Sequence, residues 1–220
     1  MSINSTNRNP FKLTNMKRAI KAIAWCVAVV VILALSLRIE RLDERTSAEF
    51  DPTEQVEHFW TEELPALLMG DRVVNADLFR QELKNNRQLL IDRYGLTLGI
   101  GAPYSLLLGG EFTVAEVGEE LSTLRTEAGA TFQMRTAYIF GNTVREATGA
   151  FSIDDYENTM DFNSIASELN DRVVECIVAP AEALLRVGSR LRVVGALDLT
   201  PKGGEEETFE LIPLLIQATE

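Results

Sequence analysis

The sequence predicts an α+β protein with an N-terminal transmembrane helix, two further helices, and a small curled β-sheet or barrel with one inserted helix. Three observations predict it: one uncharged apolar segment near the N-terminus, apolar residues at helical spacing after it, and short glycine-bounded apolar runs beyond those. At 220 residues, of which 46% are apolar and 25% charged, the chain has room for an anchor and one packed domain.

The predicted anchor is an uncharged run over residues 22–37. Flanking apolar residues extend it to 19–39, and Lys21 and Arg38 can reach back to the headgroups, so the segment is long enough to span a bilayer. The alternative is a cleaved signal peptide. Ala34-Leu35-Ser36 offers small residues at the two positions that a signal peptidase reads.

Charge divides the chain on either side of this segment. Five cations and no acid precede Ala22, and residues 1–18 form a basic tail that is expected to stay in the cytoplasm. From Arg38 onward, 16 Lys and Arg face all 33 Asp and Glu, a net charge of −17. The domain over 40–220 is therefore predicted to be extracytoplasmic at the inner membrane, and its charge excludes nucleic acid as a partner.

Two helices are predicted at the start of the domain. Asp51-Pro52 is typical of a helix start, and apolar residues from Val56 to Leu67 then form one stripe, which Pro65 is expected to bend or end. Asn75 can cap a second helix over 76–94, and a glycine follows each helix.

The remaining segments alternate in the manner of strands. The predicted strands are 112–117, 121–126, 131–140, 190–199 and 208–217. A helix is inserted from Asp161 or Asn163 to about Ile177, where Pro180 is expected to stop it. With glycines at the probable bends (Gly110, Gly141 and Gly195), five strands indicate a barrel of the oligonucleotide/oligosaccharide-binding (OB) type.

Few residues are available for chemistry. The chain has one histidine, His58, and two cysteines, Cys26 in the predicted anchor and Cys176 far from it. A zinc site or a histidine-based hydrolase would need more such groups, so we predict no metal site and no cofactor.

Two features keep a ligand-binding or enzymatic interpretation open. Asp154, Asp155 and Asp161 are concentrated in one segment, where they could act as an acid/base pair on a glycan or simply cap helices in solvent. Several aromatic residues could line a sugar-binding cleft, although core positions are the preferred interpretation: Trp60, Tyr94, Tyr104, Tyr138, Phe151 and Tyr156.

The segment from Tyr138 to Asn170 carries the most specific pattern, at Gly141, Arg145, Asp155, Asn158 and Asn170. It resembles a segment of the bacterial family of predicted periplasmic lipoproteins called domain of unknown function 2291, and the resemblance extends in order from about Arg38 to Leu199. Members of that family usually carry a lipobox cysteine. Here Ser36-Leu37 stands near that place, which favours a helical anchor over a lipid.

The resemblance implies a binding or interaction role, because family members look like accessory components of sugar-type ABC import systems. We therefore expect a non-enzymatic membrane-anchored module that contacts a transporter, its solute-binding protein or a small ligand. Arg145, Asp155 and Asn158 are the predicted ligand-binding residues. The competing interpretations are that these three only fix the loop to the barrel through hydrogen bonds, that the protein is a carboxylate-dependent glycan-acting enzyme, and that it is a purely structural envelope protein.

Overall fold

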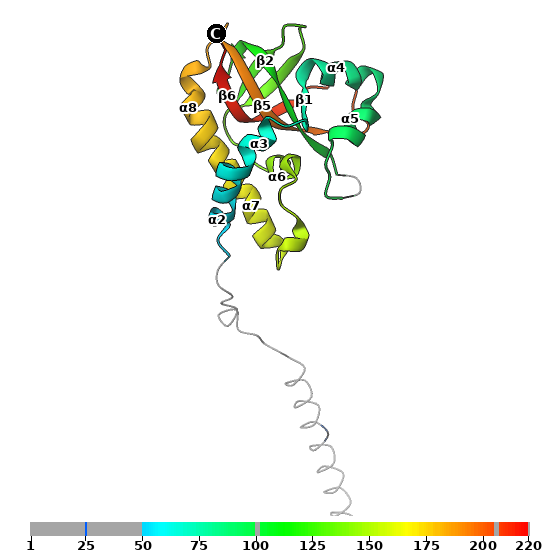
Figure 1. Ribbon diagram of the computed structural model, residues 1–220, viewed down its shortest axis with the longest axis vertical. Helices are drawn as coiled ribbons and strands as arrows, with labels where there is room; N and C mark the ends of the chain where they lie inside the picture. The colour runs from blue at the N-terminus through cyan, green and yellow to red at the C-terminus, as the bar shows by residue number, and fades with distance from the viewer. Residues whose placement is uncertain (1–24, 26–49, 100–101, 205–206, 220) are drawn as a thin grey trace, which may run out of the picture. The chain divides into compact units, whose positions relative to one another are not determined.

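The computed structural model describes residues 25, 50–99, 102–204 and 207–219 (Figure 1). From Phe50 onward the chain forms one compact unit. The predicted tail over 1–18 and anchor over 19–39 lie outside the described residues, apart from Trp25. Within the described ranges, no helix combines the length and the apolar character that a bilayer crossing requires.

The unit contains α-helices, π- and 3₁₀-helical turns (η) and six strands. In chain order they are α2 (Pro52–His58), η2 (Phe59–Glu63), α3 (Leu64–Leu68), β1 (Val73–Asn75), α4 (Ala76–Asn85), α5 (Arg87–Tyr94), β2 (Tyr104–Val117), β3 (Leu121–Arg125), β4 (Thr131–Arg135), α6 (Thr143–Thr148), η3 (Ile153–Asp155), α7 (Thr159–Arg172), η4 (Val173–Val178), α8 (Ala179–Ala181), η5 (Glu182–Leu184), β5 (Arg190–Leu199) and β6 (Glu210–Ala218).

Strands β2 to β6 close into a five-stranded barrel. β2 pairs antiparallel with both β3 and β5, β5 pairs antiparallel with β6, and β4 closes the ring by pairing in parallel with β6. The helices α6 and α7 are inserted between β4 and β5, and the short β1 adds to β2 in parallel. The predicted α+β fold with an OB-like barrel and an inserted helix is therefore confirmed.

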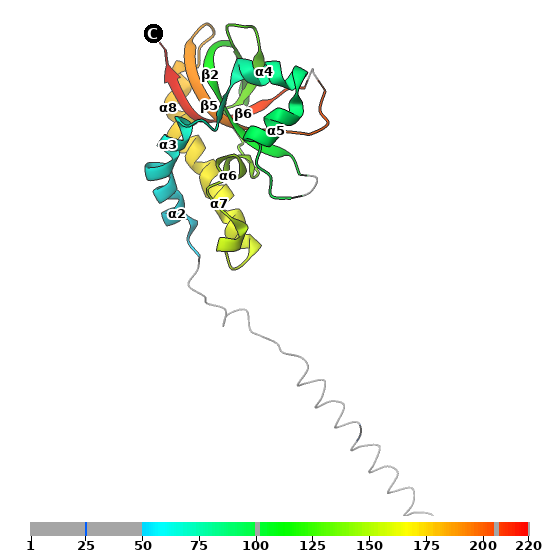
Figure 2. The same ribbon diagram turned by 45° about the vertical axis from the view of Figure 1, so that its right-hand side comes forward.

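The core has two parts on opposite faces of the same strands. Inside the barrel, Leu106, Leu108 and Phe132 pack with Phe79 of α4. Outside it, Leu107 and its neighbours on β5 and β6 pack against α2, α3, α6 and α7. Figures 1 and 2 show α4 and α5 on one side of the barrel and the α2–α3 and α7–α8 segments together on another. The central parts of β2, β5 and β6 are buried on both faces, over 105–109, 193–197 and 211–214, and they appear in the sequence as continuous apolar runs.

Strands β3 and β4 instead follow a strict alternation. Leu124 and Phe132 are buried, whereas Arg125 and Thr131, which face each other across the pair, are exposed. Thr123 and Gln133 form a hydrogen-bonded cross-strand pair at 3.3 Å. Helices therefore leave the outer face of these two strands accessible.

Several predicted boundaries are confirmed by capping hydrogen bonds. Asp51 accepts from the Thr53 N–H at 2.9 Å at the start of α2, and hydrogen bonding by the Thr53 side chain, then by its backbone, lowers the pKa of the Asp51 carboxyl. Asn75 accepts from the Asp77 and Leu78 N–H groups at the start of α4. The predicted helix over 76–94 is wrong in one respect: it is divided at Asn86, whose extended backbone ends α4 and whose side chain caps α5.

Other boundaries differ from the prediction. Pro65 and Pro180 do not end their helices, because a π-helical turn precedes each and the chain then continues as a helix. β4 ends at Arg135 rather than at Phe140, and β2 begins at Tyr104 rather than at Phe112. β1 and α6 were not predicted, because three and six residues are too few for periodicity to reveal.

Candidate functional site

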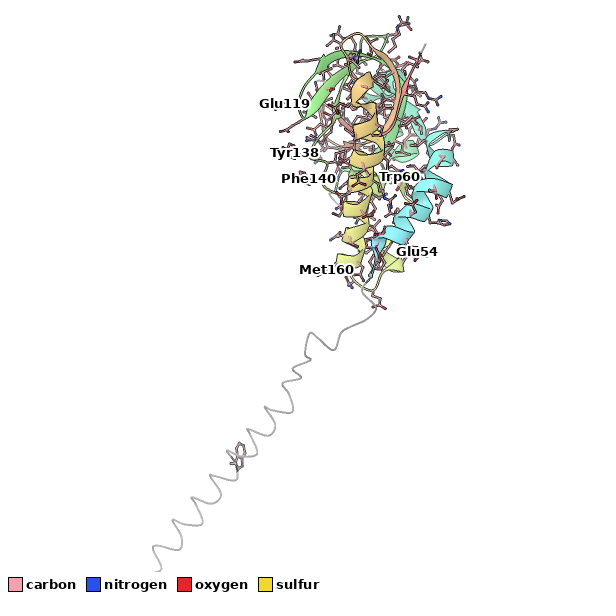
Figure 3. All side chains as sticks on the ribbon, turned by 90° about the vertical axis from the view of Figure 1, so that its left-hand side faces the viewer. Glu54, Trp60, Glu119, Tyr138, Phe140 and Met160 are labelled. Atoms are coloured by element: carbon pink, nitrogen blue, oxygen red, sulfur yellow. The ribbon has the colours of Figure 1, made fainter. Side chains whose placement is uncertain are left out.

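The segment between β4 and α6 presents two aromatic side chains to solvent. Tyr138 is 65% exposed and Phe140 is 74% exposed, and Figure 3 shows both at the margin of the domain on the same side. Tyr138 has a φ of 52°, in the left-handed region that non-glycine residues seldom occupy. A bulky residue is held there only when its surroundings enforce the conformation, and such positions cluster at ligand sites.

The surroundings of this segment supply that enforcement. Ile139, between the two rings, is buried in the outer core. The Asn170 side-chain amide of α7 donates to the Gly141 carbonyl at 3.0 Å, and Gly141 has a φ of 86°, which suits glycine. The Thr136 N–H donates to the Glu120 carbonyl at 2.8 Å. Because the Ile139 side chain is buried between them, the Tyr138 and Phe140 rings both point outward.

The rings lie at a pocket of about 460 Å³ on the side of the barrel. Its lining comes from β4, the following segment, β5 and the start of β6: Arg135, Tyr138, Phe140, Thr143, Asp198, Thr208, Glu210 and Ile212. In OB barrels the accessible face of the second and third strands, with the loop between the last two, is where oligosaccharides and oligonucleotides bind. The corresponding described parts of this chain are β3, β4 and residues 200–204 and 207–209, from which Arg135 and Thr208 line the pocket.

Two hydrogen-bonded groups fix the polar side of the pocket. Asp198 accepts from the Ser105 hydroxyl at 2.5 Å and from the Thr143 hydroxyl at 2.8 Å. The Arg135 Nε–H donates to Glu210 Oε2 at 3.0 Å. A carboxylate has about four lone-pair sites and a guanidinium five N–H donors, so each group keeps bonding capacity after these contacts. Acceptors and donors of this kind, beside exposed aromatic faces, suit a ligand that has both hydroxyl groups and an apolar ring face.

Comparison with known proteins identifies the family. A family model described as predicted periplasmic lipoprotein (DUF2291) matches residues 27–217. The chain belongs to this family. The assignment confirms the resemblance of the Tyr138–Asn170 segment and supports an extracytoplasmic, membrane-associated location.

The fold of this DUF2291 protein has a counterpart among solved structures. The crystal structure of an OB-fold protein from Thermotoga maritima is similar with a TM-score of 0.68 at 22% sequence identity, covering 77% of this chain and 99% of that one. This likeness concerns the fold alone. A search of curated proteins gives no match.

Arg145, the first residue predicted from the DUF2291 motif, is buried. It is 2% exposed, donates to the Phe162 carbonyl at 2.7 Å and to Glu146 Oε1 at 3.2 Å, and its guanidinium carbon lies 3.6 Å from the centroid of the Phe162 ring. Burial lowers the pKa of this arginine, and Glu146 partly offsets the shift. These contacts join α6 to α7. They agree with the alternative interpretation of the motif, in which Arg145 fixes its own segment to the rest of the domain through hydrogen bonds.

Asn158 and Asp155, the other two predicted residues, do not meet Arg145. Asn158 is the N-cap of α7: its side-chain oxygen accepts from the Met160 and Asp161 N–H groups at 2.9 Å, and its amide donates to the Asp161 carboxylate at 2.8 Å. Asp155 is exposed in η3, where its charge helps burial to raise the pKa of Tyr156. The structure thus places Arg145, Asp155 and Asn158 at three separate positions. The side chains of Arg145 and Asn158 form hydrogen bonds that hold helices, and Asp155 is exposed.

The acidic residues considered for catalysis are also apart from the pocket. Asp154 and Asp155 are exposed, and Asp161 is held by the Asn158 amide. None of the three lines the five principal pockets of the described residues. In the same part of the chain, no group of three His, Cys, Asp or Glu residues is arranged to hold a metal ion.

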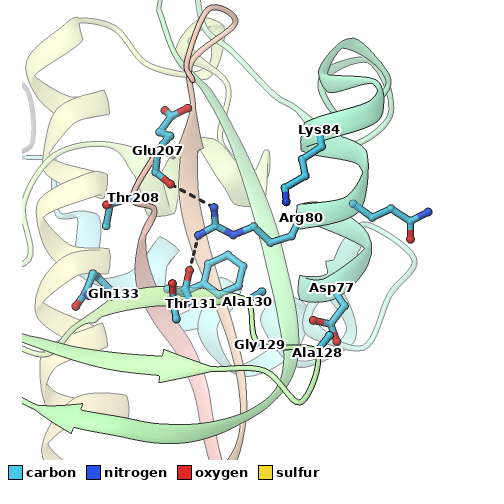
Figure 4. A pocket seen from close by; sticks show the side chains of 12 residues that line it. Asp77, Arg80, Lys84, Ala128, Gly129, Ala130, Thr131, Gln133, Glu207 and Thr208 are labelled. Atoms are coloured by element: carbon cyan, nitrogen blue, oxygen red, sulfur yellow. Dashed lines mark hydrogen bonds between the residues drawn. The ribbon is translucent and has the colours of Figure 1, made fainter. Parts of the chain in front are cut away.

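A second pocket, of about 520 Å³, is organised around an arginine with a structural role (Figure 4). Arg80 reaches from α4 to the backbone carbonyls of Glu207 and Thr131, and its guanidinium carbon lies 4.8 Å from the centroids of both the Phe132 and Phe209 rings. Burial lowers the pKa of Arg80, and the nearby Glu207 opposes that shift. Its two terminal nitrogens donate to the backbone and so close the barrel against α4, whereas its buried Nε has no hydrogen-bond partner within the described residues.

Sequence reasoning missed most of the pocket beside Tyr138 and Phe140. It named Tyr138 as a potential sugar contact but preferred a core position, and it did not select Phe140, Arg135, Asp198 or Glu210. One signal was present. Aromatic residues on both sides of Ile139, immediately before a glycine, place two rings on one side of an extended segment and the isoleucine on the other.

Proposed function

We propose that this protein is a non-enzymatic binding module at the extracytoplasmic face of the membrane, and that its pocket beside Tyr138 and Phe140 binds a sugar. The observation that carries the proposal is the exposure of these two rings next to Asp198 and the Arg135–Glu210 pair. Aromatic faces contribute apolar contact area, and fixed charged groups orient the hydroxyls of a ligand.

The DUF2291 motif fits this proposal, because its residues hold the segment that carries Tyr138 and Phe140 in place. Asn170 and Gly141 hold the segment that carries the rings, and Arg145 ties the following helix α6 to α7. In this view the motif residues position the binding segment and the rings contact the ligand. The division of roles explains why the most specific residues of the sequence are not at the pocket.

Sugar binding is tested with the full-length chain in lipid nanodiscs, using calorimetric titration with glucose, ribose, xylose and maltose. Tyr138→Ala and Phe140→Ala are each expected to weaken binding by about tenfold, the equivalent of about 1.4 kcal/mol for one lost aromatic contact. Met160→Ala is the matched control, because Met160 is an exposed apolar residue that does not line the pocket. Equal binding by all three variants would contradict the proposal.

The proposal includes a partner: the module acts beside a sugar-type ABC importer or its solute-binding protein. This part is supported by the family resemblance, and it is tested by crosslinking and pull-down from native membranes. Recovery of transporter subunits or a sugar-binding protein is the expected result, and recovery of the chain alone would contradict this part. Glycan turnover by the purified chain, abolished by Asp155→Asn, would contradict the non-enzymatic part.

A further inference from the structure

A separate apolar pocket of about 330 Å³ lies between the helices and the outer edge of the barrel. It is lined by Trp60, Leu64, Pro65, Leu68, Met69, Ile177, Arg192, Leu214, Leu215 and Gln217. None of these residues lines the pocket beside Tyr138 and Phe140. In Figure 3 the labelled Trp60 lies where the cyan α2–α3 segment and the yellow-to-orange α7–α8 segment run side by side.

Both helical walls of this pocket contain a π-helical turn. In η2 the Leu64 N–H donates to the Phe59 carbonyl, and in η4 the Ala179 N–H donates to the Val174 carbonyl, five residues back in each case. A proline follows each of these donors directly, at Pro65 and Pro180. In an α-helix, a proline cannot donate a hydrogen bond to the carbonyl four residues before it, and its ring collides with that carbonyl. A widened turn before the proline relieves both problems.

The two widened turns place residues at the same pocket. Trp60 belongs to η2 and Ile177 to η4, and Leu64 and Pro65 follow directly after η2. π-helical turns are rare, and they occur frequently at functional sites. Their occurrence in both walls indicates that the separation between the helices here is a built feature of the domain.

One charged residue marks the rim. Among the described residues that line the pocket, Arg192 of β5 is the only charged one. Its strand neighbours are Glu111 on β2 and Gln217 on β6. Within the part of the chain that the structure describes, the Arg192 guanidinium forms no ion pair, including none with Glu111.

We infer that this pocket binds a single aliphatic chain with an anionic headgroup, such as a medium-chain fatty acid. The apolar lining would take the chain, and Arg192 with the Gln217 amide would meet the carboxylate at the rim. The volume lies near the lower limit of small-molecule pockets, about 300–1,000 Å³, which suits one short chain rather than a two-chain lipid. Met69, 80% exposed at the pocket, is a flexible apolar side chain that can close over such a ligand.

The experiment uses the full-length protein in native membranes with a decanoate that carries a diazirine, followed by irradiation and peptide mapping. Adducts are expected on residues 60–69, 177 and 214–217. Competition by octanoate, decanoate and dodecanoate should strengthen about fourfold per added methylene while the pocket can take it, from the free energy of burying one methylene. Adducts spread along the chain without this enrichment would overturn the assignment.

Two pocket-filling variants make the result specific. Ile177→Trp and Met69→Trp, which enlarge two lining residues, should each abolish most of the pocket labelling. Thermal unfolding of both variants distinguishes the two causes of lost labelling: a variant with a filled pocket unfolds cooperatively, and a misfolded variant does not.

Arg192→Gln should weaken labelling by the decanoate probe about three- to tenfold, the range for one partly exposed charge contact, and leave labelling by the corresponding alcohol probe unchanged. Arg190→Gln is the matched control on the same strand, because Arg190 is exposed and does not line the pocket. Equal loss with both probes would overturn the role of Arg192. Pocket labelling that appears only after associated proteins are washed away would mean that a protein side chain is the occupant, and would overturn the fatty-acid assignment.

Discussion

Arg145 shows how a residue in a specific sequence motif can act through structure rather than through a ligand. Its guanidinium is enclosed, its two terminal nitrogens donate to the Phe162 carbonyl and to Glu146, and the Phe162 ring covers its face. Arginine suits such a position because its planar charged group can stack and donate at once. A motif position therefore identifies an important side chain without saying whether that side chain faces solvent.

We predict that Arg145→Met destabilises the domain by about 2–4 kcal/mol, because it removes a buried charged hydrogen bond and leaves the Glu146 carboxylate without its partner. Thermal unfolding of the full-length chain should show a midpoint lower by roughly 5–15 °C. Arg125→Met, at an exposed position on β3, is the control and should change stability by less than about 0.5 kcal/mol. If Arg145→Met instead kept its stability and lost ligand binding, Arg145 would be a ligand residue after all.

Exposure of single side chains was the least predictable property of the sequence. Asn158 and Asn75 each precede a helix, and the sequence identified Asn75 as a cap but Asn158 as a ligand residue. Both are caps, because each side chain accepts from two N–H groups of the first turn. Conversely, Tyr138 and Phe140 are apolar residues in a strand-like pattern, and only the tertiary position of Ile139 decides which way they point.

At the scale of elements, the sequence predicted the five barrel strands, the caps at Asp51 and Asn75, and the helix end at Tyr94. It missed the start of β2, the end of β4 and the start of α7, which lies at Thr159 rather than at Asp161 or Asn163. Period-two alternation and capping residues act locally, so Thr131, Asp51 and Asn75 could be interpreted correctly from their neighbours. At Pro65 and Pro180 a π-helical turn precedes the proline, and the chain continues as a helix beyond it. Local rules for proline cannot anticipate that outcome.

Gly195 is the glycine on which the barrel most depends. It lies at the irregularity between β5 and β6, and a Cβ there would be 2.4 Å from the Ile212 carbonyl oxygen and 2.9 Å from Leu211 Cγ. The backbone oxygen cannot move without breaking the pairing of the two strands. The close approach at this register shift therefore requires glycine.

We expect Gly195→Ala to destabilise the protein by about 2–4 kcal/mol, as overpacking against backbone does. Unfolding by urea should show a lower midpoint with the same slope. Gly99→Ala provides the comparison, because a Cβ at Gly99 would meet no atom of the described residues within 4 Å and the change should be neutral or slightly stabilising. Similar midpoints for both variants would mean that β5 and β6 do not approach as closely as described.

At the scale of the whole molecule, the barrel uses its surfaces differently. Helices cover the outer faces of the central parts of β2, β5 and β6, while β3 and β4 keep an accessible outer face. The pocket beside Tyr138 and Phe140 lies where the end of β4 meets exposed positions of β5 and β6, and the apolar pocket lies where the helices meet the edge of the barrel. The net charge of −17 from Arg38 onward adds long-range repulsion of other anions, so any anion that binds must do so through a local cation such as Arg192.

The orientation of the whole chain makes a prediction that two cysteines can test. Cys176 is exposed in the domain, and the other cysteine, Cys26, lies in the predicted anchor. If the domain is extracytoplasmic, a membrane-impermeant maleimide should label Cys176 in intact spheroplasts, and Cys176→Ser should remove that labelling. Labelling only after lysis would place the domain in the cytoplasm and contradict the proposed topology.

A second cysteine position separates the retained anchor from a cleaved signal peptide. In the Cys176→Ser background, Ser5→Cys introduces a thiol into the basic tail. A retained anchor with a cytoplasmic N-terminus predicts that this thiol is labelled only after permeabilisation, because five cations before the apolar segment hold the tail inside. A cleaved signal peptide predicts that the mature chain lacks the thiol altogether and that its mass is lower by the N-terminal segment. Labelling of the Ser5→Cys variant in intact spheroplasts would agree with neither, and would reverse the orientation derived from the charge distribution.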